Sequence, residues 1–335
     1  MPALIRQTLL GFSVAGLLFL GGVGGYLNMR LGGTEPVDCW VSPGSSVRAA
    51  CEQIAHCCRI RFSTVFVLLG TTYARLTGQP AVAGTYRFGP GMRYWELLRA
   101  LFSGRQLFRV RVTIPEGLTL RDIAALLWRD AGVDSARFLA LAFSDSLARS
   151  RGIPIASVEG YLMPDTYELF WRHPAEDVLE RLLRAQDRLW QARFAERARQ
   201  RGLSRHTVLT LASIIEAESP HADERRRISG VFWNRLRRGM PLQADPTTAY
   251  ALGKPGRPLA RSELLIPHPY NTYTIPGLPP GPINNPSANA LEAALEPEEH
   301  DFLYFVLRRD GSRRHLFSRT YAEHRRARSA QHASP

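Results

Sequence analysis

A predicted helix that ends in two glutamates is the strongest candidate for chemistry in this chain. In the segment VLTLASIIEAES, Glu218 lies three residues after Ile215 and continues the apolar face of the helix, whereas Glu216 projects from the opposite side. A carboxyl group at the edge of an apolar face is partly desolvated, which raises its pKa and allows general-acid chemistry near neutral pH. The alternative is an ordinary helix-end glutamate in water, paired with Arg225 or Arg226.

Three other clusters carry side chains suited to binding a polysaccharide. They read EGYLMPDTY from Glu159, LQADPTT from Leu242 and YNTYTIPGLPPGPI from Tyr270. Tyrosine rings stack on sugar faces, and Asn and Gln amides bind hydroxyl and acetamido groups. Asp245 precedes Pro246, which predicts that Asp245 is the N-cap of a short helix. Each cluster alone is also typical of structural turns, so both interpretations stay open.

Missing motifs exclude several other chemistries. The sequence contains no HExxH, P-loop, GxSxG or GxGxxG motif, and no histidines pair at metal-ligand spacing. We therefore expect no metal and no cofactor. The four cysteines, Cys39, Cys51, Cys57 and Cys58, lie within 20 residues and form no CxxC pair. They are compatible with a disulfide or with small core residues at Cys51 and Cys58, and their spacing fixes no connectivity.

The net charge of +13 first suggests a polyanionic partner. The chain has 43 Lys+Arg against 30 Asp+Glu, but Lys254 is its only lysine and the arginines are scattered along the sequence. A scattered arginine excess is more typical of a compositional bias than of a nucleic-acid site, which gathers basic residues on one face. We expect no nucleic-acid partner.

An uncharged stretch near the N-terminus predicts a membrane anchor. Residues 8–27 form 20 residues without a charge, TLLGFSVAGLLFLGGVGGYL, and as a helix they would be about 30 Å long, the thickness of a bilayer core. A cleaved signal peptide would end in an A-x-A-like site, and none follows Leu27. A buried core helix is the other alternative. We expect a cytoplasmic end at 1–7, a retained anchor at 8–27 and a linker at 28–40.

A small α+β subdomain is expected over residues 41–108. Three segments of the chain share an apolar residue, a Pro/Gly turn and an amphipathic helix, and they align on Gly44, Gly91 and Gly117. Strand–turn–helix units of this kind resemble LysM-type glycan-binding modules, and generic α+β packing gives a similar pattern. In the third segment, Thr119 and Asp122 predict a capping box at the start of a helix.

A larger mixed domain is expected over residues 109–325. RVRVTI alternates as a strand does, and an amphipathic helix is predicted from about Pro174 to Arg201. Ser204 starts the helix that carries the two glutamates. The proline-rich residues 241–297 predict ordered loops that line a groove.

The C-terminal part of this domain has a clear hairpin pattern. FLYFVLRRDGSRRHLFS predicts two strands that turn at Asp310 and Gly311. Residues 326–335 are basic and lack periodicity, which predicts an irregular tail. The expected fold class is therefore α+β, with an N-terminal transmembrane helix ahead of both domains.

Taken in order, these segments resemble one family. EGYLMPDTY, LASIIEAES, GVFWNRLRRGMPLQADPTTAY and YNTYTIPGLPPGPINNP are similar to the motifs of endolytic murein transglycosylases of the MltG (YceG-like) type. The resemblance extends from about residue 41 to residue 325. It implies a single-pass protein of the inner membrane, with a LysM-like subdomain and a catalytic domain in the periplasm.

The resemblance also implies roles for individual residues. In the family the second glutamate of the helix motif is catalytic, and here this residue is Glu218. A lytic enzyme of this type cleaves the β-1,4 bond between N-acetylmuramic acid and N-acetylglucosamine and leaves a 1,6-anhydro end without consuming water. We expect the following residues to line or support the sugar sites: Gln243, Asp245, Asn271, Tyr273, Glu159 and Asp165.

Two other functions stay open at this point. One is a membrane protein that binds peptidoglycan without cutting it, and the other is a hydrolytic muramidase that uses the same groove. The expected partners are peptidoglycan strands and the membrane. The resemblance adds a peptidoglycan synthase, beside which such an enzyme would terminate glycan elongation.

Overall fold

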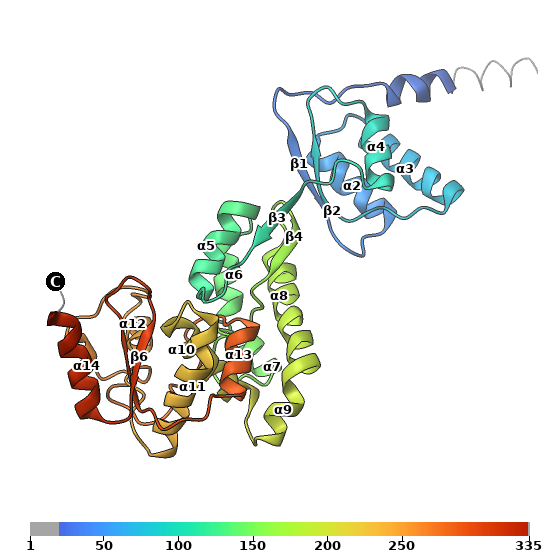
Figure 1. The fold of residues 1–335 in the computed structure, drawn as a ribbon. Helices are drawn as coiled ribbons and strands as arrows, with labels where there is room; N and C mark the ends of the chain where they lie inside the picture. Colours follow the sequence, from blue (N-terminus) through green and yellow to red (C-terminus); the bar gives the residue numbers. More distant parts are fainter. Residues whose placement is uncertain (1–19, 334–335) are drawn as a thin grey trace, which may run out of the picture. The chain divides into compact units, whose positions relative to one another are not determined.

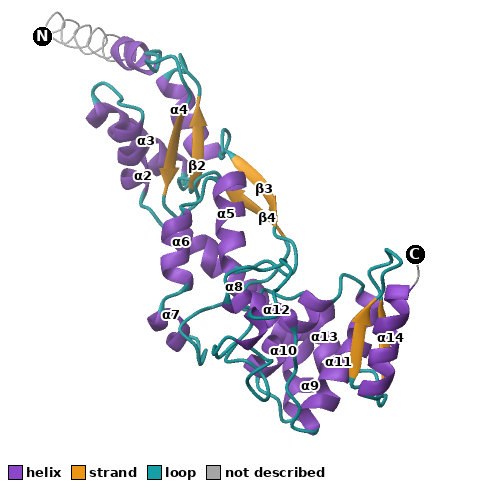
Figure 2. Cartoon of the chain, turned by 90° about the vertical axis from the view of Figure 1, so that its left-hand side faces the viewer, coloured by secondary structure: helices purple, strands orange, loops and turns teal. Residues whose placement is uncertain are grey.

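The computed structural model describes residues 20–333, which fall into two compact units (Figure 1). The first unit runs to Val110 and also includes Glu168–His173, and the second contains Arg111–Tyr167 and the chain from Pro174 onward. Both helices and short antiparallel sheets are present, so the α+β class is confirmed (Figure 2).

Most of the predicted anchor at residues 8–27 lies outside the described residues. Residues 20–27 are described, and they are helical. Among residues 20–333, no helix has the length and apolar character needed to cross a membrane.

After the helical residues 20–27, the first unit packs three further helices with one two-stranded sheet. β1 (Val37–Val41) and β2 (Gly84–Phe88) pair antiparallel, with Cys39 opposite Tyr86. The helices are α2 (Val47–Cys57), α3 (Ser63–Thr77) and α4 (Tyr94–Ser103). A disulfide joins Cys39 in β1 to Cys57 at the end of α2, while Cys51 and Cys58 are buried free thiols. The connectivity that the sequence left open is thus one bridge and two core cysteines.

The three aligned glycines have the same structural role in each segment. Gly44, Gly91 and Gly117 all have φ between +75° and +77°, the left-handed region that favours glycine. Each lies three residues before the first residue of a helix, because α2 begins at Val47, α4 at Tyr94 and α5 at Leu120. The predicted capping box at the third helix is confirmed, since the Asp122 carboxylate accepts the backbone N–H of Thr119 at 3.1 Å.

Two paired strands carry the chain between the units. β3 (Arg109–Thr113) lies where the alternating pattern predicts a strand, and it pairs with β4 (Thr166–Phe170). The end of β4 and the residues after it belong to the first unit, where the Thr85 hydroxyl donates to the Trp171 carbonyl at 2.5 Å.

The second unit is mainly helical, and its core is formed by α10 (Arg205–Glu218), which packs against α11 (Ala222–Arg237) and α13 (Ala288–Leu295). Every residue from Val208 to Ile215 is buried, because α10 is covered on several sides. The other elements of the unit are α5 (Leu120–Ala131), α6 (Ser135–Ala142), α7 (Asp145–Ser150), α8 (Ala175–Leu189), α9 (Ala195–Gln200), α12 (Asp245–Ala251), α14 (Tyr321–Ala333), β5 (Tyr304–Leu307) and β6 (His315–Ser318).

The structure confirms two predictions for this unit and corrects a third. The amphipathic pattern after Pro174 forms α8 and α9, joined by a π-helical turn at Trp190–Phe194, and the predicted hairpin is β5–β6. The prediction of an irregular tail is wrong, because α14 continues to Ala333. Its start is fixed by Glu323, whose carboxylate accepts the Arg319 N–H at 2.9 Å.

Candidate active site

Helix α10 ends at the glutamate that the sequence singled out. Its start is capped by Ser204, whose hydroxyl accepts the backbone N–H of Thr207 at 3.0 Å. Glu218 is its last residue, and Pro220 follows the C-cap Ser219, where it prevents another helical turn. The buried helix therefore holds a carboxylate at a fixed terminus.

Glu218 borders two cavities of about 340 Å³ each. Glu218 and Asp245 line both of them. The first is also lined by Gly117, Thr119, Ala217, Pro246, Ala249, Tyr250, Pro255, Gly256, Arg257, Ile283 and Asn284. The second is lined by Arg235, Leu242, Gln243, Tyr273, Phe305, Val306, Leu307 and His315. A chain-like substrate that occupies both cavities would pass the Glu218 carboxyl group.

The surroundings of Glu218 favour its protonated form. Burial and the neighbouring negative charge of Asp245 raise the pKa of Glu218 to about 8, and the positive charge of Arg235 opposes this increase. At neutral pH the group is therefore mostly a carboxylic acid and has a proton to donate. The raised pKa agrees with the prediction made from the position of Glu218 on the apolar face of the helix.

Glu216, two residues earlier, lies in a different environment. Its carboxylate forms an ion pair with Arg225 and accepts the backbone N–H of Ser287 at 2.9 Å. Arg225 is fixed in turn by the Ser287 hydroxyl, to which it donates at 2.9 Å. The alternative that Arg225 neutralises Glu218 is therefore wrong, because that arginine pairs with Glu216 on the opposite side of α10.

Asp245 and Tyr273 form a polar pair beside Glu218. The Tyr273 hydroxyl donates to the Asp245 carboxylate at 2.5 Å. The prediction that Asp245 is the N-cap is wrong, because Asp245 is the first residue of α12 and Ala244, whose side chain makes no capping hydrogen bond, is the N-cap. Burial and the Asp245 charge raise the pKa of the Tyr273 hydroxyl, which therefore stays protonated as a donor. The Tyr273 hydroxyl thus holds the Asp245 carboxylate, and Asp245 lines both cavities.

Gln243 is held at the second cavity by an unusual backbone conformation. Its φ of 51° lies in the left-handed region, and its N–H donates to the Thr272 carbonyl at 3.0 Å. The side-chain oxygen of Gln243 accepts from Arg235 at 3.2 Å. This geometry brings an exposed amide to the cavity wall, as expected for a sugar-binding residue.

Asn271 was expected at the sugar sites, but the structure places it away from both cavities. It is fully buried and lines neither cavity. Its amide nitrogen donates to the carbonyls of Leu264 and Ile266 at 3.0 and 2.9 Å, and its oxygen accepts from the Thr248 hydroxyl at 2.8 Å. These bonds place Asn271 as the residue that fixes the loop carrying Tyr273.

Glu159 is a buried support of the site. It is 1% exposed, and its carboxyl group is bonded by the Leu120 N–H at 3.1 Å and the Asn285 amide at 3.0 Å. Burial raises the pKa of Glu159 to about 8. The Tyr250 hydroxyl, from a residue that lines the first cavity, approaches it at 3.4 Å. Glu159 therefore links the start of α5 to the cavity wall without reaching the cavity.

Asp165 is exposed and lines neither cavity. Its carboxylate accepts the N–H of the next residue, Thr166, at 2.7 Å, and its own carbonyl accepts the Ile114 N–H at 2.9 Å. These contacts hold the chain beside the end of β3. These hydrogen bonds give Asp165 a structural role and no contact with either cavity.

Sequence reasoning missed Arg235 and His315, which both line the second cavity. Arg235 is buried, and its guanidinium donates to the carbonyls of Leu303 and Leu242 at 2.7 and 2.9 Å. His315 contacts the buried Glu224 carboxylate at 3.0 Å. Arg235 lies within the charged run NRLRR, which looks like a solvated helix face, and no local pattern marked His315.

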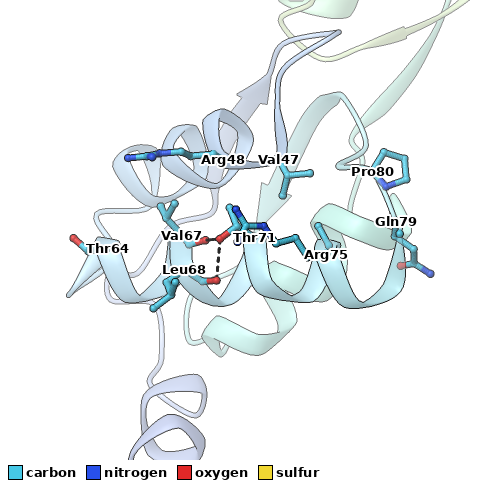
Figure 3. Close-up of a pocket in the computed structure, with 11 residues that line it drawn as sticks. Val47, Arg48, Thr64, Val67, Leu68, Thr71, Arg75, Gln79 and Pro80 are labelled. Atoms are coloured by element: carbon cyan, nitrogen blue, oxygen red, sulfur yellow. Dashed lines mark hydrogen bonds between the residues drawn. The ribbon is translucent and has the colours of Figure 1, made fainter.

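A larger cavity, of about 660 Å³, lies in the first unit between α2 and α3 (Figure 3). Its lining contains two arginines, Arg48 and Arg75, with no carboxyl group and no histidine. It offers neither an acid nor a base for catalysis. A second cavity of about 660 Å³ beside it is lined by Glu52 and His56, among others. The assignment of the chemistry to the two cavities beside Glu218 therefore rests on the raised pKa of that carboxyl group.

Comparison with known proteins identifies the family. The sequence matches the model of the YceG-like family over residues 39–330. This chain belongs to the YceG-like family. The match includes every residue that lines the two cavities beside Glu218.

Relatives in the YceG-like family carry one name. The chain is 32% identical over 262 residues to the endolytic murein transglycosylase of Bacillus subtilis, covering 73% of this chain and 71% of that protein. It is 31% identical over 254 residues to the endolytic murein transglycosylase of Streptococcus pneumoniae, covering 67% of this chain and 46% of that longer protein. A crystal structure of a yceG-like protein from Listeria monocytogenes aligns with a TM-score of 0.60 at 30% identity, covering 88% and 100% of the two chains.

Proposed function

We propose that Glu218 cleaves the β-1,4 bond between N-acetylmuramic acid and N-acetylglucosamine and leaves a 1,6-anhydro end on the muramyl sugar. The enzyme class rests on the family: the chain is a peptidoglycan lytic transglycosylase. The scissile bond, the product and the residues are our proposal. The observation that carries it is a carboxyl group with a pKa raised to about 8 that lines two cavities.

The reaction needs one group that acts first as an acid and then as a base. Protonated Glu218 donates its proton to the glycosidic oxygen, and the bond from that oxygen to C1 of the muramyl sugar breaks. The C6 hydroxyl oxygen of the same sugar then bonds to C1 and gives its proton to the Glu218 carboxylate. The acid is regenerated, one sugar gains a free 4-hydroxyl, and no water is consumed.

Asp245, held by Tyr273, would stabilise the positive charge that develops on the sugar during this reaction. The transition state of glycoside cleavage carries positive charge at C1 and the ring oxygen. Asp245 lines both cavities and faces Glu218, so its carboxylate is placed to stabilise that charge. Tyr273 holds Asp245 by their 2.5 Å hydrogen bond, and Gln243 offers its amide to sugar hydroxyl or acetamido groups.

The decisive experiment compares Glu218→Gln with the wild type on purified, uncrosslinked glycan strands, with product ends identified by mass spectrometry. Loss of 1,6-anhydro products in Glu218→Gln supports the proposal, and unchanged release of those products would refute it. Glu216→Gln is the matched control on the same helix, because its side chain lies in the Arg225 pair. It is expected to stay active when assayed as folded protein.

One observation favours a second candidate, a hydrolytic muramidase. Two carboxylates beside one groove are the usual equipment of glycoside hydrolases, and Asp245 supplies a second one here. Digestion in ¹⁸O-labelled water separates the two reactions. A hydrolase places the label on a new reducing end, whereas a lytic enzyme leaves unlabelled anhydro ends.

We also propose that the chain is anchored in the inner membrane through residues 8–27, with residues 1–7 in the cytoplasm and the chain from residue 28 onward outside it, where it terminates strands beside a peptidoglycan synthase. The uncharged 20-residue stretch supports the anchor. The Cys39–Cys57 disulfide supports an oxidising compartment. Protease added to intact spheroplasts should digest the C-terminal part, and full protection would contradict this topology.

A further inference from the structure

Helix α3 in the first unit has apolar side chains on its outside as well as its inside. From Phe62 to Ala74 the chain has 13 consecutive uncharged residues. Phe66 and Gly70 face inward, and Gly70 lies so close to α2 that an added Cβ would come within 2.4 Å of the Cys51 sulfur. Several large apolar side chains are nevertheless exposed: Phe62 71%, Leu76 82%, Leu68 63%, Tyr73 44% and Val65 37%.

These exposed side chains share one side of the helix. At about 100° per residue, Leu68, Val65, Leu76 and Tyr73 fall within an arc of roughly 140°, and Phe62 is the exposed N-cap just before them. A surface helix of a globular protein usually places polar residues on this side. The exposed stripe therefore marks an interaction surface, which we call the α3 stripe.

The α3 stripe begins where the uncharged N-terminal stretch ends. Residues 20–27 are the last part of that stretch, and they form a helix in the first unit. The Tyr26 hydroxyl donates to the backbone carbonyls of Arg61 and Phe62 at 3.0 and 3.1 Å. Tyr26 also packs edge-on against Tyr94 at a centroid distance of 5.3 Å. The residues just before α3 are thus bonded directly to the end of the predicted membrane segment.

Positive side chains flank the stripe at both ends. Arg59 and Arg61 precede it and Arg75 lies within its last turn, and all three are exposed. Figure 3 shows Arg75 and Leu68 on the same helix, with Arg48 on α2 across the groove. Apolar side chains bounded by arginines match the boundary of an anionic bilayer, where acyl chains meet phosphate groups and guanidinium groups reach outward.

We propose that α3 lies in the surface of an anionic phospholipid bilayer and forms a second membrane contact of the first unit. This inference rests on the proposed anchor, because the anchor is what brings α3 to the bilayer. A single helix leaves a protein free to tilt and rotate about the anchor. A second contact removes that freedom and holds the first unit against the membrane surface.

The test uses the full chain in vesicles that contain phosphatidylglycerol, with a spin label on Leu68→Cys or Leu76→Cys. Glu52→Cys on α2 is the control, since its side chain is exposed and charged. The native Cys51 and Cys58 are buried, so labelling is selective for the introduced thiol. We expect the labels at positions 68 and 76 to collide several-fold more often with oxygen than with a water-soluble nickel chelate, and the label at 52 to show the reverse.

The possible results separate this inference from the anchor. If the full chain floats with the vesicles but the labels at 68 and 76 report water, the α3 contact is wrong and the anchor stands. If the chain does not float, both proposals fail. Dipolar broadening between labels on two copies would overturn the inference in favour of a dimer. Loss of the oxygen preference in vesicles of uncharged lipid supports the role given to the arginines.

Discussion

Glu218 and Asp245 line both cavities of the groove, and the charge of Asp245 contributes to the raised pKa of Glu218. They come from different elements, the end of α10 and the start of α12. Their proximity links the activity of one carboxyl group to the charge of the other, and this link is measurable.

The first prediction concerns pH. With a pKa near 8, Glu218 loses its proton as the pH rises through that value, so kcat/KM should fall on the alkaline side. Asp245→Asn removes a like charge, lowers the pKa of Glu218 and should move this fall to lower pH. Asp165→Asn removes an exposed carboxylate away from the cavities and should leave the profile in place. Identical profiles for wild type and Asp245→Asn would contradict the coupling.

The second prediction separates activity from stability at Glu218. Glu218→Gln should lower turnover by about 10²–10⁴-fold, the usual contribution of a general acid. A carboxyl group whose folded-state pKa is raised loses stabilising free energy as the pH rises from its unfolded pKa to its folded pKa. The variant should therefore have a larger free energy of unfolding than the wild type near pH 8, by at least about 1 kcal/mol, and this difference should close near pH 4.

Thermal unfolding measured at several pH values checks this directly. If the difference in unfolding free energy between Glu218→Gln and the wild type does not change with pH, then burial does not raise the pKa of Glu218. A less stable variant at pH 8 would show that Glu218 has a structural role instead.

The third prediction concerns Glu216, which should behave in the opposite way. Its pair with Arg225 is buried, with 6% and 10% of the two side chains exposed. Removing one partner leaves a buried charge without compensation, so Glu216→Gln should cost about 3 kcal/mol of unfolding free energy. Activity per folded molecule should stay near the wild-type value. Chemical denaturation and strand digestion at low temperature measure the two quantities separately, and a large loss of turnover in folded protein would give Glu216 a part in catalysis.

The fourth prediction contrasts two amide residues. Asn271→Ala removes an amide that satisfies buried carbonyls and a hydroxyl, so it should destabilise the protein by at least about 2 kcal/mol and reduce activity through the displaced loop. Gln243→Ala should leave stability within about 1 kcal/mol, because the side chain is exposed, and should raise KM. Equal losses of stability in both variants would contradict the positions given to them.

How much the sequence could predict depends on how local each feature is. Helical periodicity places Glu218 and Glu216 on different sides of the helix, and the structure has this arrangement, although Glu216 is also buried, in its pair with Arg225. Asn271 and Gln243 are both amides in proline-rich loops, and residue type alone does not show which one faces the cavity. Only the folded loop shows that the carbonyls of Leu264 and Ile266 use the Asn271 amide.

Features that depend on contacts between distant residues could not be predicted from the sequence, for a similar reason. Arg235 is buried because Leu303, just before β5, and Leu242, in the loop after α11, close over it, and nothing within its own helix indicates this. The helical C-terminus was different, since Thr320 and Glu323 form a recognisable capping pattern that the basic composition obscured.

The return of Glu168–His173 to the first unit means that this unit is not continuous in the gene. Synthesis has to proceed well into the second unit before Thr85 meets Trp171 and Trp40 meets Phe170. A fragment that stops at Val110 would lack these partners. The first unit is therefore not one contiguous block of sequence, and moving only the chain up to Val110 into another protein would leave out part of its packing.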